Sequence, residues 1–321
     1  MMNASALNFN RVLAFEVAKD TLVVHALPAD RQIIIANRPA QVRRLLRAAM
    51  RESEEPLLVA CEASGGYERH VLEAACAFGI ACHRAHGARV RYFAKYLGVA
   101  AKTDAIDARM IAGYALSTHD LRLYRPPTAE QADIRALKTR RDEVQRIMLA
   151  EANRLERILQ PRVRASLKAH IRFLKRELDA LENDIAAAIA AAPALAEQAR
   201  LMQSVAGVGP ATTAALIAYF PELGALAKNQ AARLAGLAPI ARDSGKSSAA
   251  RHVEPGRAAL RRALYMAAVV AIRHNPRLRT FAERLKAKGK PFKVVVTAVM
   301  RKLVVILNAV LQQRQPAHAD P

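Results

Sequence analysis

The chain of 321 residues is long enough for two or three domains, and it contains 52% apolar but only 5% aromatic residues, with no Trp. This composition favours helices rich in Ala, Leu and Val and argues against an all-β sandwich. The formal net charge of +22 is concentrated in residues 197–321, where 20 Lys and Arg stand against 6 Asp and Glu. We therefore expect a polyanionic partner such as nucleic acid, the alternative being a basic protein without one.

The first 122 residues alternate short strands and helices. The predicted strands cover residues 12–18, 21–27, 32–36, 57–61 and 81–85, and the predicted helices cover 39–51, 67–78, 88–97 and 104–117. Three hairpin-linked strands followed by alternating helices and strands match the RNase H-like layout, which is a mixed sheet flanked by helices. Residues 10–122 are therefore assigned to an α/β domain of this class.

A stretch with two prolines, 124–128, ends this pattern and precedes about 65 residues that are almost free of Gly. Apolar residues then recur at spacings of three and four on both sides of Pro161, as in a heptad seam. We expect two long helices over residues 128–192 that form a coiled-coil hairpin, paired with each other or with another subunit. A plain amphipathic hairpin without an oligomeric role is the alternative. The residues of the seam are Ile134, Leu137, Val144, Met148, Leu155, Val163, Leu167, Ile171, Leu174, Leu178, Leu181, Ile185 and Ala188.

Residues 197–313 are expected to form a basic, mainly α C-terminal domain of short helices and loops. Its sequence VAGVGPA (205–211), followed by an apolar stretch, resembles a helix-hairpin-helix turn, whose glycines let the backbone approach a phosphate. A simple Gly-rich connection fits these residues about as well. No Walker A or dinucleotide-binding fingerprint occurs, so nucleotide hydrolysis and dinucleotide chemistry have no support.

Four carboxylates are predicted to gather in the N-terminal domain. Glu16 lies in the first strand, Glu62 ends the fourth, and Asp104 and Asp107 start the last helix with a spacing that places them on one face. Clusters of oxygen ligands suit Mg²⁺ or Mn²⁺, and two such ions can stabilise the attacking and leaving oxygens of a phosphodiester. Each acid alone has an ordinary explanation, as a charge near a helix start or a strand end, but the set favours a metal site.

A serine in a basic loop is the second candidate for chemistry. Ser244 precedes Gly245, and a serine hydroxyl becomes a nucleophile when a base or an electropositive site assists its ionisation. Clustered guanidinium groups can also hold a phosphate. Taken alone, these residues favour a phosphate-contacting loop without catalysis, and Ser247 and Ser248 are neighbouring candidates for the nucleophile. The nearby cations are Arg242, Lys246, Arg251, Arg257, Arg261 and Arg262.

Several motifs together resemble the DEDD-type insertion-sequence transposases, most of all the eleven-eleven group of the one-ten insertion-sequence family, to which the pilin-gene DNA invertase is related. The resemblance runs from about Val12 to Leu311. The motifs are KTDAIDA (102–108), EASGGY (62–67), GLAP (236–239), SGK (244–246), GRAALRRALYMA (256–267), RHNP (273–276), GKP (289–291) and MRKL (300–303).

The resemblance implies a RuvC-like N-terminal domain in which Glu16, Glu62, Asp104 and Asp107 hold Mg²⁺ (or Mn²⁺), and in which Ser244 forms a transient serine–DNA phosphodiester. It also implies a structured bridge RNA that guides the enzyme to element ends and target DNA, and a homo-oligomer, either a dimer or a tetramer. Residues expected to contact nucleic acid are Lys102, Arg242, Lys246, Arg251, Arg257, Arg261, Arg262 and Lys302.

The function expected from this resemblance is an RNA-guided insertion-sequence transposase. The alternatives are a site-specific DNA invertase of the same family, a catalytically impaired nucleic-acid-binding relative, and a metal-dependent junction nuclease. At the position of Glu16 the family has Asp, so this chain departs from the family pattern there. The catalytically impaired relative therefore remains one of the alternatives. A longer side chain moves the carboxylate oxygens by roughly 1 Å, a shift that can lower a rate about 10²-fold.

The three cysteines, Cys61, Cys76 and Cys82, form no CxxC pair and no zinc-ligand spacing, so neither a disulfide framework nor a zinc site is expected. The N-terminus shows no signal-peptide pattern, and the most apolar stretches are interrupted by Arg and Lys. We therefore expect a cytoplasmic protein without a membrane partner.

Overall fold

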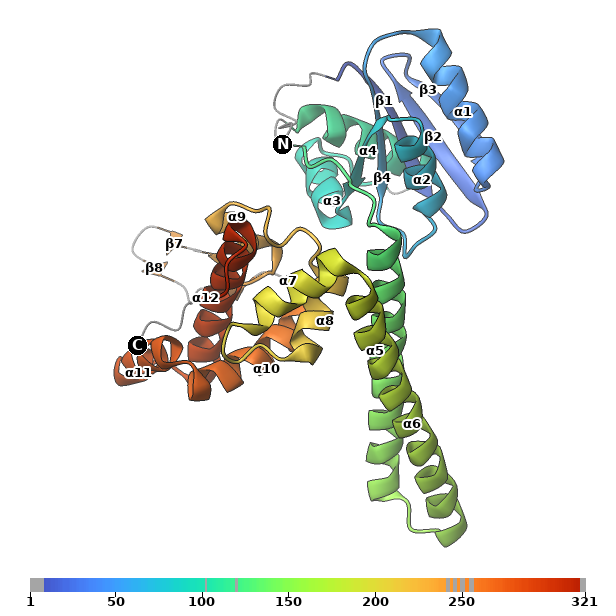
Figure 1. Cartoon of the computed structure of the whole chain (residues 1–321). Helices are drawn as coiled ribbons and strands as arrows, with labels where there is room; N and C mark the ends of the chain where they lie inside the picture. The colour runs from blue at the N-terminus through green and yellow to red at the C-terminus, as the bar shows by residue number, and fades with distance from the viewer. Residues whose placement is uncertain are drawn as a thin grey trace. The chain divides into compact units, whose positions relative to one another are not determined.

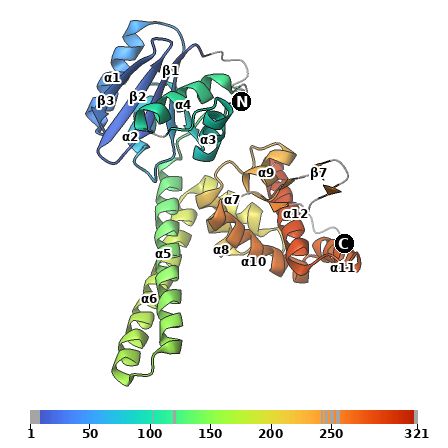
Figure 2. The same ribbon diagram turned by 180° about the vertical axis from the view of Figure 1, so that it is seen from behind.

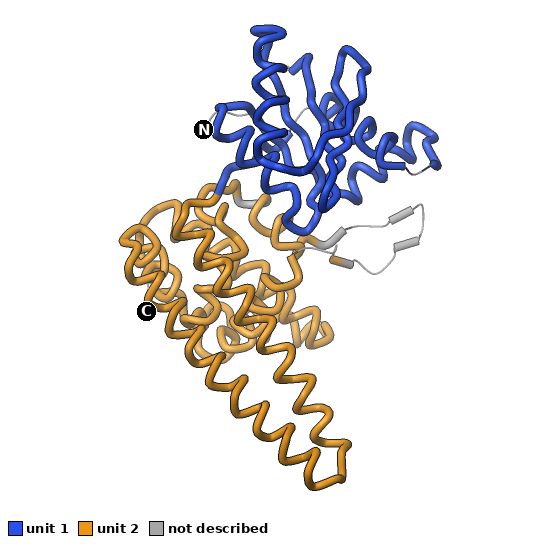
Figure 3. Tube along the Cα trace, turned by 90° about the vertical axis from the view of Figure 1, so that its right-hand side faces the viewer, with its two compact units in different colours: residues 1–126 blue, residues 127–321 orange. Residues whose placement is uncertain are grey.

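The computed structural model describes residues 9–101, 103–118, 121–240, 243–244, 247–248, 252–253 and 257–317. The chain divides into two compact units, Met1–Pro126 and Pro127–Pro321, which Figure 3 colours blue and orange. The division lies inside the proline-containing stretch 124–128, where the alternation of strands and helices ends. The further separation of the second unit into a helical hairpin (128–192) and a C-terminal domain (197–313) stays a prediction.

The first unit is a mixed sheet flanked by helices (Figure 1). The sheet has the order β3-β2-β1-β4-β5, in which β1 is antiparallel to β2, β2 is antiparallel to β3, and β1, β4 and β5 are parallel. This is the predicted RNase H-like layout, so the fold class of the first domain is confirmed. Its elements are β1 (Arg11–Val17), β2 (Thr21–Leu27), β3 (Arg31–Ala36), α1 (Pro39–Glu52), β4 (Leu57–Glu62), α2 (Arg69–Ala77), β5 (Ala81–Ala85), α3 (Gly87–Tyr96) and α4 (Asp104–Ser117).

Side-chain alternation along the central strands gives the sheet two covered faces. On one face, Leu13 and Phe15 of β1 pack in a core with residues of α1 and α2. On the other, Val12 and Ala14 pack with residues of α3 and α4. Because both faces are covered, almost every position of β1 and β4 is apolar, and a carboxylate in these strands is conspicuous.

Threonine side chains cap the starts of α5 and α4. Thr128 and Gln131 form a capping box at the start of α5, and the Thr103 hydroxyl accepts a hydrogen bond from the Ile106 N–H at the start of α4. The start of α2 differs from the prediction by two residues. Gly65 and Gly66 both have positive φ, so the chain turns there and the helix begins only at Arg69.

The second unit begins with two long helices, α5 (Ala129–Arg157) and α6 (Pro161–Ala191), which lie side by side in Figures 1 and 2. Val144, Leu174 and Leu178 form a small core between them, and Ile134 and Ile185 enter the larger core of the unit. The two predicted helices and the break before Pro161 are confirmed, and the helices pair with each other. Supercoiling and pairing with another subunit remain predictions.

The rest of the second unit is mainly helical, as predicted. It contains α7 (Pro193–Gln203), α8 (Pro210–Tyr219), α9 (Lys228–Leu234), β6 (Pro239–Ile240), β7 (Asp243–Ser244), β8 (Ser247–Ser248), β9 (His252–Val253), α10 (Ala258–His274), α11 (Pro276–Ala287) and α12 (Phe292–Gln313). The expectation of short helices alone is wrong for α10, with 17 residues, and for α12, with 22.

Helix α12 is the one described helix that is long and apolar enough to cross a membrane by length and composition. Half of its most apolar stretch is buried inside the fold. Val295, Val299, Leu303 and Leu307 follow a spacing of four and are fully buried in the core of the second unit. The packing of this helix therefore accounts for its apolarity. Arg301 and Lys302, which interrupt the apolar run in the sequence, are exposed.

Candidate active site

The parallel pairing of β1 and β4 places Glu16 and Glu62 side by side. The register pairs Phe15 with Cys61, so the next position along both strands pairs the two glutamates. Glu16 continues the alternation of Val12 and Ala14, whose side chains face α3 and α4, and Glu62 is at the matching position of β4. Both glutamates are half-buried. Two carboxylates from adjacent strands thus lie on the same face of the sheet.

Helix α4 covers that same face and contributes the other two acids. Asp104 is its first residue and is exposed, and Asp107 is one turn further on and half-buried. Met110 and Ile111, later in the helix, anchor α4 against the sheet in a core with Val12 and Ala14. The structure therefore places Glu16 and Glu62 on the face of the sheet that is covered by α4, the helix that bears Asp104 and Asp107 in its first turn.

The four acids do not form a closed cluster. Among the residues that the structure describes, no three His, Cys, Asp or Glu side chains lie close enough together to hold a metal ion. The chemistry of the set nevertheless fits a divalent cation, because all four donors are carboxylate oxygens, the ligands that Mg²⁺ and Mn²⁺ prefer. Like charges oppose their convergence, and a divalent cation would offset that repulsion.

Gly87 limits where the Glu62 carboxylate can lie. A Cβ atom at Gly87 would be 2.0 Å from Oε1 of Glu62, so the carboxylate occupies space that only glycine leaves open. Gly87 is also the first residue of α3, whose first turn contains no acid and whose N-cap residue makes no side-chain cap. The Glu62 carboxylate thus lies beside the N-terminus of α3, the end of a helix at which acidic side chains are commonly placed. The sequence analysis did not single out Gly87.

A fifth acid, Glu68, organises the loop that follows Glu62. Its Oε2 accepts hydrogen bonds from the Ser64 N–H (3.2 Å), the Ser64 hydroxyl (3.2 Å) and the Gly66 N–H (2.8 Å). Its Oε1 lies 3.6 Å from the Arg84 guanidinium. Burial opposes the ionisation of Glu68, but the hydrogen bonds outweigh it and hold the pKa of this carboxyl below its usual value. The side chain is 5% exposed, so its role is to hold the loop.

Cys61, next to Glu62 in β4, is not a nucleophile. Complete burial and the neighbouring Glu68 raise the pKa of its thiol far above the ordinary value, so it stays protonated. Cys76 and Cys82 are free thiols with sulfur atoms 3.7 Å apart. Among the described residues, none of the three cysteines lies in a group of His, Cys, Asp or Glu side chains that could hold a metal ion.

The predicted nucleophile lies in the second unit, in a segment of very short strands. Ser244 belongs to β7 and pairs with Ser247 of β8, and Asp243 pairs with Ser248. Outside this hairpin, Pro239 and Ile240 of β6 pair with Val253 and His252 of β9. Four predicted contact residues lie outside the described part of the chain, namely Lys102, Arg242, Lys246 and Arg251.

Arg257 fixes the point at which this segment ends and α10 begins. Its guanidinium donates hydrogen bonds to both carboxylate oxygens of Glu222 (2.7 and 2.6 Å) and to the Tyr219 carbonyl (2.7 Å). Such a bidentate pair is strong and directional. Arg257 thus joins the start of α10 to the end of α8 and the loop after it. The sequence suggested only contact with nucleic acid for this residue.

The other predicted contact residues of the second unit differ in accessibility. Arg261 is half-buried, Arg262 is exposed, and the exposed Lys302 ammonium lies 4.3 Å from the centre of the Phe281 ring. The structure leaves contact with nucleic acid a prediction for all of them.

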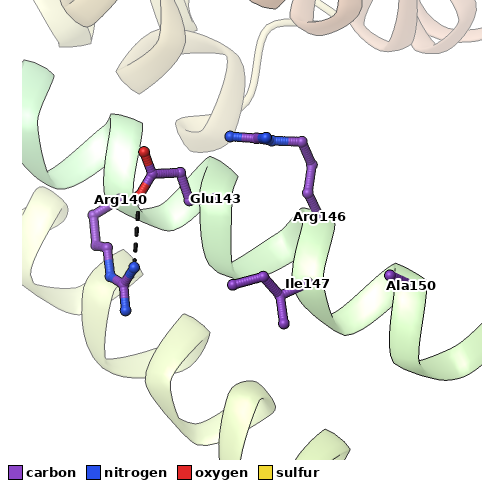
Figure 4. Close-up of a pocket in the computed structure, with 5 residues that line it drawn as sticks. All are labelled: Arg140, Glu143, Arg146, Ile147 and Ala150. Carbon is purple, nitrogen blue, oxygen red and sulfur yellow. Dashed lines mark ion pairs between the residues drawn. The ribbon is translucent and has the colours of Figure 1, made fainter.

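Two open hollows lie along α5. Figure 4 shows the residues that line the first one, where Arg140 and Glu143 form an ion pair of 3.5 Å. The second shares Arg146 with the first and is also lined by Arg262. Neither hollow contains one of the four acids or Ser244. The first is lined by Arg140, Glu143, Arg146, Ile147 and Ala150, and the second by Thr139, Asp142, Arg146, Tyr219, Ala259 and Arg262.

The VAGVGPA turn has a packing explanation for one of its glycines. Gly207 has a φ of 102°, and a Cβ there would be 2.5–2.7 Å from Ala271 of α10. Gly209 caps α8 with no neighbouring atom within 4 Å of the position of a Cβ, so it leaves that helix start open. Of the two, only Gly209 fits the predicted phosphate approach.

Two family profiles match the chain, and they cover both units. The profile of the DEDD transposases of the IS110 type matches residues 15–161, and that of the transposase IS116/IS110/IS902 family matches residues 199–283. Glu16, Glu62, Asp104 and Asp107 lie within the first match, and Ser244 lies within the second.

Similar proteins include the pilin gene-inverting proteins of Moraxella bovis and Moraxella lacunata, each 30% identical over 234 residues, which is 71% of this chain and 71% of each relative. The insertion element IS110 uncharacterized 43.6 kDa protein of Streptomyces coelicolor is 30% identical over 168 residues, which is 48% of this chain and 39% of that protein. Among solved structures, T. thermophilus RuvC in complex with Holliday junction substrate matches 36% of this chain and 99% of that chain, with a TM-score of 0.28 and 12% identity.

From the two profiles and the Moraxella relatives, we conclude that this chain belongs to the IS110-type family of DEDD transposases.

Proposed function

We propose that this protein cuts and rejoins DNA as an insertion-sequence transposase that combines a carboxylate-bound metal with a serine nucleophile. Membership of its family makes it an enzyme, a DNA transposase or recombinase. The observation that carries the metal half of the proposal is the in-register placement of Glu16 and Glu62 on the face that α4 covers. Asp104 and Asp107 start that helix.

In this proposal Glu16, Glu62, Asp104 and Asp107 would hold Mg²⁺ or Mn²⁺, which would supply Lewis-acid stabilisation of charge on the phosphodiester. The Ser244 hydroxyl attacks a DNA phosphorus atom. A bond from that phosphorus to a deoxyribose oxygen breaks, the serine hydroxyl loses its proton and the leaving oxygen gains one to become a DNA hydroxyl, and a serine–DNA phosphodiester results. A DNA hydroxyl then attacks the same phosphorus and releases the serine. Arg242, Lys246 and Arg251 precede or follow Ser244 closely in the sequence and are proposed to bind the phosphate.

The proposed partners are element ends and target DNA, a structured guide RNA, and further copies of this chain. The charge of residues 197–321 supports the nucleic-acid partners, because each phosphate neutralised by Lys or Arg releases counterions. The guide RNA and the oligomer rest on the family resemblance alone.

A second candidate is a DNA invertase, and the Moraxella relatives favour it, since both are named pilin gene-inverting proteins. The two functions share their chemistry and differ in the DNA around the gene. Element ends and a non-coding RNA region beside the gene support the transposase, whereas inverted sites that flank a neighbouring coding segment support the invertase.

The chemistry is tested by a covalent-adduct assay with purified protein, its presumptive RNA, labelled junction DNA and Mg²⁺, resolved on a denaturing protein gel. We expect an adduct with wild type and with the control Glu73→Gln, an exposed acid of α2. We expect none with Ser244→Ala or Glu62→Gln. Cleavage that survives Ser244→Ala without an adduct would instead indicate a junction nuclease.

The same assay with Glu16→Asp tests whether the longer side chain limits catalysis. We expect adduct formation to rise by up to about 10²-fold, because the carboxylate retreats by roughly 1 Å to the position that the family uses. An adduct in Glu16→Asp but not in wild type means that this copy is impaired. An absent adduct in both, despite DNA binding, would reject the recombinase in favour of a binding protein.

A further inference from the structure

Helix α3 has one face packed into the fold and one face open to solvent. Val90 is buried, and Phe93 lies against Gly113 and the ring of Tyr114 in α4. On the open side of the helix, Tyr92 is 70% exposed and Tyr96 is 84% exposed. Their spacing of four places both tyrosines on the same side of the helix. The chain has seven tyrosines, and two of them are largely exposed on neighbouring turns of one helix, which favours a binding partner for this surface.

The exposed face of α3 is also basic. Arg89, Arg91 and Lys95 are exposed and lie between and beside the tyrosines, and α3 contains no acid. None of these three cations forms an ion pair with another residue in the described part of the chain. We call the five residues Arg89, Arg91, Tyr92, Lys95 and Tyr96 the α3 platform.

The α3 platform begins at the acidic site. Gly87, the first residue of α3, is the residue against which the Glu62 carboxylate lies. At 1.5 Å per residue, Tyr92 is about 8 Å and Tyr96 about 14 Å along the helix from Gly87. The two ring positions differ by about 6 Å, which an extended nucleic-acid strand spans with one or two nucleotides.

Aromatic faces interleaved with cations fit an unpaired nucleic-acid strand better than a duplex. Bases stack on aromatic rings only when they are not covered by neighbouring base pairs, and the cations neutralise the phosphates between them. We propose that the α3 platform binds unpaired nucleotides of the DNA strand next to the phosphodiester at the acidic site, by stacking bases on Tyr92 and Tyr96. This assignment rests on the proposed function for the position of the reacting phosphodiester. The binding surface itself is independent of catalysis.

The test measures binding of the full-length protein to a single-stranded DNA that contains 2-aminopurine, whose fluorescence falls on stacking, with EDTA present to prevent cleavage. The variant Tyr92→Ala/Tyr96→Ala removes both rings, and Tyr92→Phe/Tyr96→Phe retains both. Phe173→Ala serves as the matched control, because Phe173 is a 49%-exposed aromatic residue on α6, between Arg172 and Lys175.

We expect the double alanine variant to bind the single strand at least about 30-fold more weakly and to lose most of the quenching. Its affinity for a duplex of the same sequence should be unchanged. The double phenylalanine variant and Phe173→Ala should match wild type. With 5-iodouracil in the strand, photo-crosslinks should map to the peptides that contain Tyr92 and Tyr96.

Equal binding and quenching by the double alanine variant and wild type would overturn the proposal. A loss confined to single-stranded RNA, or a changed oligomeric state on size-exclusion chromatography, would also overturn it, in favour of an RNA site or a subunit interface. Because the assay contains no metal, it does not depend on the chemistry. A wild-type protein that stacks 2-aminopurine but forms no serine adduct would refute the proposed function and leave the α3 platform standing.

Discussion

The acidic site (Glu16, Glu62, Asp104 and Asp107) and the serine segment (the short strands β6 to β9) differ in what holds their functional side chains in place. Glu16 and Glu62 occupy regular strands in which most other residues are buried, so strand register and alternation determine where each carboxylate points. Ser244 sits in a two-residue strand, inside a second pair of two-residue strands. The packed cores on both faces of the sheet constrain the backbone that carries these acids through many contacts. The serine segment depends on a few hydrogen bonds and on the anchors at its ends, of which Arg257 is one.

This contrast indicates whether a substitution in each region should change mainly catalysis or mainly folding stability. At the acidic site itself, a change that only displaces a carboxylate should alter catalysis through geometry, with little effect on folding, whereas a change to Glu68, which holds the adjoining loop through buried hydrogen bonds, should lower the stability. At the end of the serine segment, a change should weaken the local fold first. The predictions below test that difference, beginning with the largest effect.

Gly87→Ala should slow DNA cleavage by about 10²-fold, because the new Cβ takes the space of Glu62 Oε1 and the carboxylate must move by an ångström or more. Gly87 does not have a positive φ and lies in a helix, so alanine should not lower the stability. The measurement is single-turnover adduct formation, together with thermal unfolding. Glu62→Asp, combined with Gly87→Ala, shortens the displaced side chain and should restore part of the rate. A Gly87→Ala variant with the wild-type rate would show that Glu62 is not positioned by α3.

Glu68→Gln should lower the free energy of unfolding by about 2 kcal/mol at neutral pH, since an ionised acceptor of buried hydrogen bonds is replaced by a neutral amide. Because folding lowers the pKa of Glu68, its contribution is present above the unfolded-state value of about 4.3 and is lost as the pH falls through the folded-state value. The stability difference between wild type and Glu68→Gln should therefore shrink in acid. Urea unfolding at a series of pH values checks this, with Glu73→Gln as an exposed control. A difference that does not change with pH would contradict the ionised state of Glu68.

Arg257→Ala should lower the free energy of unfolding by about 1 kcal/mol, because the Arg257 and Glu222 side chains are 34% and 25% exposed and solvent screens their attraction. For a unit of this size that corresponds to about 3 °C in Tm. Differential scanning calorimetry measures the shift. The exposed Arg262→Ala is the matched control, with an expected change within about 0.5 kcal/mol. A Tm shift in the control as large as in Arg257→Ala would show that general charge, and not the ion pair with Glu222, is responsible.

Much of the first unit could be predicted because its signals are local. Short, nearly continuous apolar runs predicted the central strands, and the acids at 16 and 62 stand out since they interrupt or end those runs. The helix predicted over residues 104–117 has these bounds in the structure, and in the second unit Pro161, expected between the two long helices, is the first residue of α6. The length of α12 was missed for an equally local reason. Arg301 and Lys302 interrupt its apolar run, although both lie on its exposed side.

The sequence by itself determined which residues are available for chemistry: four carboxylates on elements of known order, a serine in a basic segment, and the motifs of the family. Only the tertiary structure decided which atoms meet. Gly87 lies 25 residues beyond Glu62, and Glu222 lies 35 residues before Arg257, yet each pair is in contact. Periodicity and capping act over a few residues, so they set secondary structure. Contacts between elements depend on how strands align and helices pack, and that is determined by the whole core at once.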